Sequence, residues 1–274
     1  MSTQLRTRSA TTWIVVLAGI GSLMAALDTV VVAAGLSTIR LDLHASVEQL
    51  EWTVNAYNLS FAVLLITGAV LGDRYGRRRF YVFGLGLFAI ASAACALAPD
   101  AGWLIAGRAL QGVGAALLAP LSLTLVASAF PAAKRGAAIG AFSAITGIAV
   151  AAGPTLGGAV INGFAWEWIF WLNVPIGLLA IPFVLTRIDE SFGSDTTIDL
   201  PGLLLVSTGA FGIVWALVRG NAVGWGSVEV LVTLLLGAAL MAGFVLWERH
   251  SSSPMLPMAF FASRSFTASN GAIF

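Results

Sequence analysis

Long apolar stretches alternate with short polar segments along the whole chain. A helix that crosses the roughly 30 Å hydrocarbon core of a bilayer needs about 20 mainly apolar residues. Stretches of this kind occupy residues 13–36, 52–72, 80–98, 102–128, 136–161, 168–186, 199–218 and 228–247. A further apolar stretch begins near Phe266, but the sequence ends at Phe274, and a helix of that length rises only about 13 Å. The pattern predicts eight transmembrane helices and the truncated start of a ninth.

The amino-acid composition supports this interpretation. Hydrophobic residues make up 58% of the 274 residues and charged residues only 10%, whereas soluble proteins average roughly 45–50% and about 25%. This excess excludes a soluble enzyme and a disordered chain, and the formal net charge of +1 excludes a nucleic-acid binder that relies on charge. The single Cys95 excludes a disulfide framework and a thiolate metal cluster, while His44 and His250 lie at segment edges. We expect an all-α polytopic protein in the lipid bilayer, without a metal, a cofactor or a nucleic-acid partner.

The distribution of basic residues predicts the orientation of the chain. Cytoplasmic segments of membrane proteins carry an excess of Lys and Arg. With the N-terminus in the cytoplasm, the segments on that side hold Arg6, Arg8, Arg74, Arg77, Arg78, Arg79, Lys134, Arg135, Arg187, Arg249 and Arg264. The outer segments then hold only Arg40 and Arg219. The bias predicts a multi-pass protein of the cell membrane with a cytoplasmic N-terminus.

Two charged residues lie well inside the predicted spans, Asp28 in the first and Arg108 in the fourth. Counted along the helices, Asp28 lies roughly 12 Å and Arg108 roughly 9 Å below the outer surface, so the two can pair if their helices are neighbours. A charge in hydrocarbon costs at least about 2.5–3.5 kcal/mol and therefore needs a reason. One interpretation is a static ion pair that holds helices together. The other is a carboxylate whose proton affinity is set by burial and by the nearby cation, as a proton-coupled carrier requires.

The loop between the second and third spans combines glycines with charged residues. Gly72, Asp73, Arg74, Gly76 and Arg77 lie within a short connection that also contains two further arginines. A cytoplasmic anchor would explain the arginines but not the aspartate or the glycines. An aspartate at a helix end beside arginines can also form a latch that responds to pH or conformation, or approach the positive N-terminus of another helix.

Small and polar residues also interrupt two other spans. In the fifth span, the residues that break the apolar pattern are Gly153, Pro154, Gly157 and Gly158. They indicate either close helix packing or a flexing element, because proline removes a backbone hydrogen bond. In the second span, Asn55 and Asn58 lie one turn apart, and they can either line a cavity or form hydrogen bonds between helices.

Five motifs together resemble the major facilitator superfamily, and more closely its fourteen-helix drug–proton antiporter branch. They occur at residues 68–79, 108–115, 147–158, 27–36 and 166–177. The first is similar to the superfamily's cytoplasmic signature between helices two and three, the second to its fourth-helix motif, and the third to the antiporter motif of helix five. The last two, with Leu27-Asp28-Thr29 and Trp166-Glu167-Trp168, resemble motifs of the fourteen-helix branch.

This resemblance implies roles for individual residues. Asp28 would recognise a proton or a cation, and Arg108 would assist proton exchange. Residues of the cytoplasmic gate would be Gly72, Asp73, Arg74, Gly76 and Arg77. The fourth-helix motif includes Gln111 and Gly112, and the antiporter bend includes Gly153, Pro154, Gly157 and Gly158. The chain departs from the branch at Glu167, where arginine is usual, and at Ala33 and Ser37, which replace asparagine and proline.

The resemblance also implies a domain organisation. A cytoplasmic N-terminus (1–12) would precede a six-helix N-terminal bundle (13–186), a cytoplasmic connector (187–198) and two inserted helices (199–247). A second cytoplasmic connector (248–265) would then lead into the truncated ninth helix (266–274). The family fold has a second six-helix bundle, which this sequence lacks.

The function implied is secondary active transport rather than catalysis. A carrier of this branch would export drugs or other amphipathic or cationic small molecules by alternating access, with H⁺ as the coupling ion. It would need the missing C-terminal bundle as a partner. The alternative is a truncated membrane fragment that does not transport and acts at most through helix–helix association.

Overall fold

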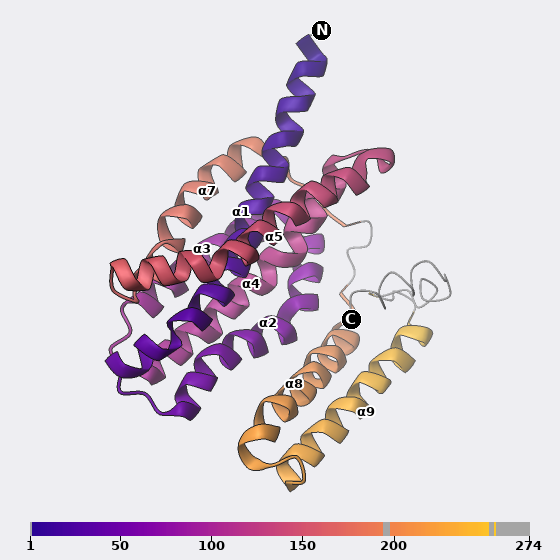
Figure 1. Cartoon of the computed structure of the whole chain (residues 1–274). Helices are drawn as coiled ribbons and strands as arrows, with labels where there is room; N and C mark the ends of the chain where they lie inside the picture. Colours follow the sequence, from indigo (N-terminus) through magenta and orange to yellow (C-terminus); the bar gives the residue numbers. More distant parts are fainter. Residues whose placement is uncertain (1, 194–197, 252–254, 256–274) are drawn as a thin grey trace. The chain divides into compact units, whose positions relative to one another are not determined.

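The computed structural model describes residues 2–193, 198–251 and 255. Its helices are α1 (Ser2–Asp42), α2 (Val47–Tyr75), α3 (Arg77–Ala96), α4 (Ala101–Ala129), α5 (Ala132–Gly163), α6 (Trp168–Trp171), α7 (Asn173–Arg187), α8 (Leu200–Val223) and α9 (Val228–His250) (Figure 1). Eight spans in these residues are long and apolar enough to cross a membrane, which confirms the eight predicted spans. The expected start of a ninth helix, at 266–274, lies outside the described residues.

Two helices differ in detail from the predicted spans. Helix α1 begins at Ser2, well before the apolar stretch that starts at residue 13. The sixth span consists of the short α6 followed by α7, with Leu172 between them. Pro175 has no N–H to donate to the carbonyl of Trp171, four residues earlier, so the regular hydrogen-bond pattern is interrupted at this point.

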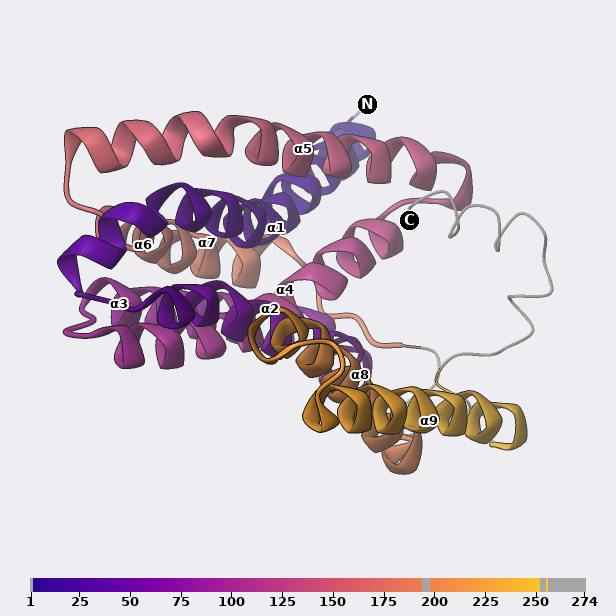
Figure 2. The same ribbon diagram turned by 60° about the horizontal axis from the view of Figure 1, so that its bottom comes forward.

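Helices α1 to α7 form one compact unit, and α8 and α9 form a second. Within the first unit, α4 packs mainly against α2 and α3, while α1 packs mainly against α5. Figure 2 shows α1 and α5 side by side, with α2, α3 and α4 as a second layer. This arrangement places α1 and α4, which carry the two charged residues of the spans, in direct contact.

Glycines allow α4 to approach its neighbours closely. A Cβ added at Gly114 would lie 3.0 Å from atoms of Phe88 on α3, and one at Gly112 would meet the backbone of Tyr57 on α2. Small residues at such contacts let membrane helices pack backbone to backbone, where van der Waals contact replaces the hydrophobic effect. The glycine in the fourth-helix motif therefore sets the distance between α2 and α4.

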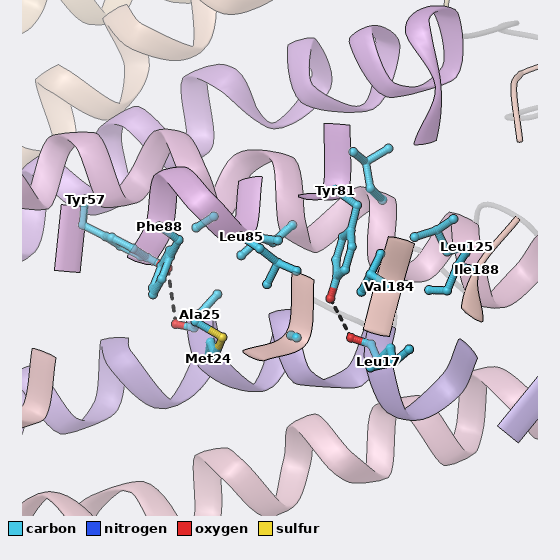
Figure 3. Packing of buried hydrophobic residues seen from close by; sticks show 14 residues of the cluster. Leu17, Met24, Ala25, Tyr57, Tyr81, Leu85, Phe88, Leu125, Val184 and Ile188 are labelled. Carbon is cyan, nitrogen blue, oxygen red and sulfur yellow. Dashed lines mark hydrogen bonds between the residues drawn. The ribbon is translucent and has the colours of Figure 1, made fainter. Parts of the chain in front are cut away.

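One apolar core of the first unit joins α1, α2, α3, α4 and α7 and contains Tyr81. The Tyr81 hydroxyl donates to the carbonyl of Leu17 over 2.8 Å (Figure 3). It also accepts from the N–H of Gly21 over 3.1 Å. A buried hydroxyl needs such partners. The contact fixes α3 against the first half of α1, below the part of α1 that carries Asp28.

The second unit is a helical hairpin. Cβ atoms added at Gly209, Gly212 or Gly237 would come within about 3 Å of backbone atoms of the facing helix, so these glycines make the close contact between α8 and α9. At one end of the hairpin, the Trp247 indole donates to Asp199 over 2.7 Å. Ser227 caps α9 through the N–H of Val230.

Candidate functional site: a buried polar cluster beside an apolar cavity

The structure brings Asp28 and Arg108 together. The Nη1 of Arg108 donates to Oδ2 of Asp28, and the two side chains are only 1% and 0% exposed, respectively. Asp28 comes from the middle of α1 and Arg108 from the first half of α4. The pair is therefore a fully buried ion pair between two spans, as the matching depths of the two residues allow.

The second oxygen of the Asp28 carboxylate accepts two amide donors. Nε2 of Gln111 and Nδ2 of Asn173 each donate to Oδ1 over 3.1 Å. Gln111 lies on α4 one turn after Arg108, and Asn173 is the first residue of α7. Three donors from two helices thus surround one carboxylate of a third helix, and both of its oxygens accept hydrogen bonds.

Arg108 and Gln111 extend the cluster to α2 and α3. Arg108 donates Nη1 to Oε1 of Gln111 over 2.7 Å and Nε to the carbonyl of Thr53 over 3.2 Å. Gln111 in turn donates to Oγ of Ser92 over 2.7 Å, and Cys95 donates to the Gln111 oxygen over 3.4 Å. Partial satisfaction of such a network would be costly in a medium of low polarity. Its members lock five helices together.

Two aromatic rings flank the guanidinium of Arg108. Its Cζ lies 4.4 Å from the centroid of the Tyr57 ring and 5.9 Å from that of Phe170. A cation is attracted to the face of an aromatic ring, most strongly where water is excluded. Tyr57 is itself buried, and its hydroxyl donates to the carbonyl of Ala25 over 3.3 Å (Figure 3).

Sequence reasoning identified part of this cluster and missed the rest. Asp28, Arg108 and Gln111 were expected to be functional, and they are in contact. Ser92 and the contact from Tyr57 were not expected, and Asn173 was noted only within a motif. A search for polar side chains in the middle of spans, in addition to charged ones, would have found Ser92 and Asn173.

An apolar cavity of about 500 Å³ lies on another side of α1. Its walls come from α1, α2, α4 and α5 and consist of Ser22, Ala25, Ala26, Thr29, Val30, Tyr57, Asn58, Phe61, Ala119, Leu123, Phe142, Thr146 and Val150. None of these residues is charged at neutral pH. Asn58 is exposed and lines the cavity, whereas Asn55 is half-buried and is not among the lining residues.

The residues that were expected to form a cytoplasmic gate lie at the turn between α2 and α3. Nε of Arg77 donates to Oδ1 of Asp73 over 2.6 Å. Gly76 joins the two helices with φ of +117°, a conformation that favours glycine because it has no Cβ. Gly72 packs against the side chain of Leu121, and Arg74 lies 5.4 Å from the ring centroid of Tyr75.

The segment after α7 is hydrogen-bonded to this turn. The sequence did not predict this contact. The Glu190 carboxylate accepts from the N–H groups of Arg78 and Arg79 over 2.8 and 3.2 Å. It therefore satisfies free donors at the start of α3, as a capping residue does. The N–H of Gly193 also donates to the carbonyl of Asp73 over 2.8 Å.

The small residues of the fifth span divide into two kinds. Cβ atoms added at Gly153 and Gly157 would lie 2.7 and 3.1 Å from Val30 and Val31 of α1, whereas one at Gly158 would meet nothing within 4 Å. The first two therefore allow α5 to pack on α1. The helix continues through Pro154 to Gly163. In the described part of the chain, no three His, Cys, Asp or Glu side chains are grouped so that they could hold a metal ion.

Eight apolar spans and a buried ion pair define a polytopic helical membrane protein, and comparison with known proteins gives its family. The sequence model of the Major Facilitator Superfamily matches residues 18–258. The chain belongs to this superfamily.

Similar curated proteins include the tetracenomycin C resistance and export protein of Streptomyces glaucescens, which is 37% identical over 91% of this chain and 47% of its own length. The multidrug resistance protein Stp of Mycobacterium tuberculosis is 39% identical over 90% and 47%. The methylenomycin A resistance protein of Streptomyces coelicolor is 38% identical over 91% and 53%. The chain thus spans about half the length of these relatives.

Solved structures show the same fold. The proton:xylose symporter XylE bound to 6-bromo-6-deoxy-D-glucose matches with a TM-score of 0.55 and 17% identity, over 94% of this chain and 57% of XylE. A peptide transporter, POT, in complex with sulfate matches with a TM-score of 0.62 and 17% identity, over 86% and 52%. At this identity the similarity shows the architecture alone.

Proposed function

We propose that this chain is part of a proton-coupled carrier that exports drugs or other amphipathic small molecules. The observation that carries the proposal is the Asp28 carboxylate, held in the membrane-spanning bundle by Arg108, Gln111 and Asn173. The names of the relatives support the substrate class, since they are resistance and export proteins. The five sequence motifs favour the fourteen-helix antiporter branch.

The geometry of Asp28 favours proton exchange over contact with substrate. Its side chain is fully buried and does not line the apolar cavity. A proton on Oδ2 would remove the negative charge and turn the oxygen that faces Arg108 from an acceptor into a donor, while Oδ1 could still accept from Gln111 and Asn173. Protonation is therefore linked to the ion pair that joins α1 to α4.

The apolar cavity is where we place the substrate. Ligand pockets are mostly apolar with a few polar groups, and this cavity has that character, with Asn58, Thr29 and Thr146 as its polar members. In the complete carrier the second half would close over the cavity, and the two halves would rock around it. Asp73 and Arg77 would act on this inward–outward equilibrium, with the N-terminus on the cytoplasmic side of the cell membrane.

The test uses the complete carrier in proteoliposomes with an imposed pH gradient. Asp28→Asn should abolish export of a cationic dye and of a neutral amphiphile while the protein still inserts. Asp73→Asn should slow turnover with little change in equilibrium binding. Undiminished gradient-driven export by Asp28→Asn would refute proton coupling at this residue.

The alternative is a membrane fragment that does not transport and acts at most through helix–helix association. The length comparison favours it, because the chain covers only about half the length of its relatives. By itself the 274-residue chain would insert in the membrane without transporting, since alternating access needs two bundles. Purified chain in proteoliposomes should then show no more flux than empty liposomes. Flux that is lost on Asp28→Asn would show instead that half a carrier is sufficient.

A further inference from the structure

Asp28 and the apolar cavity lie on different faces of α1. The α1 residues that line the cavity are Ser22, Ala25, Ala26, Thr29 and Val30. With 3.6 residues per turn, Asp28 points about 130° away from their mean direction. A ligand in the cavity therefore does not touch the carboxylate, and a residue that contacts both the cavity and the ion pair can couple the two.

Tyr57 belongs to both places. Its side chain lines the cavity, and its ring lies 4.4 Å from the guanidinium carbon of Arg108, which is paired with Asp28. Its hydroxyl donates to the Ala25 carbonyl on the cavity side of α1. The ring thus separates the cavity from the ion pair.

The backbone that carries this ring is held in place by the contact between α2 and α4. Ser60 of α2 donates its hydroxyl to the carbonyl of Ala109 over 2.8 Å. Gly112 faces the Tyr57 backbone so closely that a Cβ would collide with it. A displacement of the ring therefore cannot be absorbed by a loose neighbouring helix, and it changes the ring's distance from Arg108.

We propose that Tyr57 transmits occupancy of the cavity to Asp28 through Arg108. The inference rests on the proposed function and adds its coupling residue. A ligand that pushes on the ring alters the cation–π contact, and thus the field that Arg108 exerts on the carboxylate. Coupling of this kind is reciprocal, so protonation of Asp28 also changes the affinity of the cavity. The titratable groups around Asp28 are Arg108 from α4, Tyr57 from α2 and Cys95 from α3, while α7 provides the uncharged Asn173.

The experiment fills the cavity without needing to know the natural ligand. Val150 lines the cavity and is exposed, so Val150→Cys can be labelled with a benzyl methanethiosulfonate. The chain's own cysteine, Cys95, is buried, and the chain without the Val150 substitution, treated identically, is the blank. The protonation of Asp28 is followed in nanodiscs by its carboxyl infrared band over a pH titration, and the band is assigned by its loss in Asp28→Asn.

We expect the label to shift the titration midpoint of Asp28 by about 0.4–1.5 pH units, the range that corresponds to a buried cation–π contact. Tyr57→Phe keeps the ring and should keep the shift. Tyr57→Leu should abolish it, and Tyr57→Met provides a second variant without a ring if the first fails to fold. Phe142→Leu removes another aromatic ring of the cavity and should leave the shift intact.

The outcomes separate this inference from the proposed function. A shift that persists in Tyr57→Leu or Tyr57→Met, or no shift in the chain with Tyr57, overturns the role of Tyr57 and leaves proton exchange at Asp28 standing. If the unlabelled chain has no titrating band that Asp28→Asn removes, the proposed function fails, and this inference fails with it.

Discussion

Replacement of Arg108 by methionine should destabilise the first unit strongly. The substitution removes the ion pair with Asp28, the bonds to Gln111 and the Thr53 carbonyl, and the contact with the Tyr57 ring. Two amide donors remain on the carboxylate, but no cation does. Removing one partner of a buried ion pair typically costs about 3–5 kcal/mol. The amide bonds from Gln111 and Asn173 are already present before the substitution, so they cannot compensate for the lost cation.

The double variant Arg108→Met/Asp28→Asn distinguishes the cost of an unpaired carboxylate from the cost of lost packing. Removing both charges avoids a lone buried carboxylate, and such replacements are often neutral. We therefore expect the double variant to recover most of the unfolding free energy that Arg108→Met loses.

The assay is unfolding of the purified chain in mixed micelles, followed by tryptophan fluorescence. Arg219→Met is the matched control, because Arg219 pairs with Glu229 at the more exposed end of the second unit, and exposed ion pairs contribute little. It should leave the transition almost unchanged. An equal loss of unfolding free energy in the single and double variants would refute the argument, since the cost would then come from packing and not from the uncompensated carboxylate.

Three further predictions concern helix contacts. Gly112→Ala should cost about 1–3 kcal/mol of unfolding free energy by overpacking, because the added Cβ would collide with the α2 backbone. Gly158→Ala is the control, since a Cβ there has open space and should not destabilise the chain. Similar losses in both variants would contradict this reasoning. Glu190→Ala should cost about 1 kcal/mol through lost capping of α3, and amide exchange at Arg78 should accelerate, unlike in the exposed control Asp189→Ala. Tyr81→Phe should cost about 1 kcal/mol by removing the buried hydroxyl bond to Leu17, and an unchanged unfolding midpoint would show that this bond contributes nothing.

The sequence determined the number and type of the elements. In a bilayer every backbone polar group must be satisfied internally, so each long apolar stretch has one available structure, and the eight predicted spans are helices. The sequence also determined the depth of Asp28 and Arg108, because each residue adds a fixed rise along its helix. The free-energy cost of placing a charge in hydrocarbon identified Asp28 and Arg108 as candidate functional residues without any knowledge of the fold.

Only the tertiary structure decided which side chains meet. Depth is a local quantity, but the rotation of a helix about its axis and the choice of its neighbours depend on packing over the whole bundle. Ser92 and Asn173 are uncharged and carry no mark in the sequence that distinguishes them from ordinary polar residues of spans, yet α3 and α7 bring them into the cluster. Glu190, distant in sequence from the α2–α3 turn, caps α3 for the same reason. In the sequence, Tyr57 does not differ from other aromatic residues of apolar helices. In the structure, the close contact between α2 and α4 places it beside both Arg108 and the cavity.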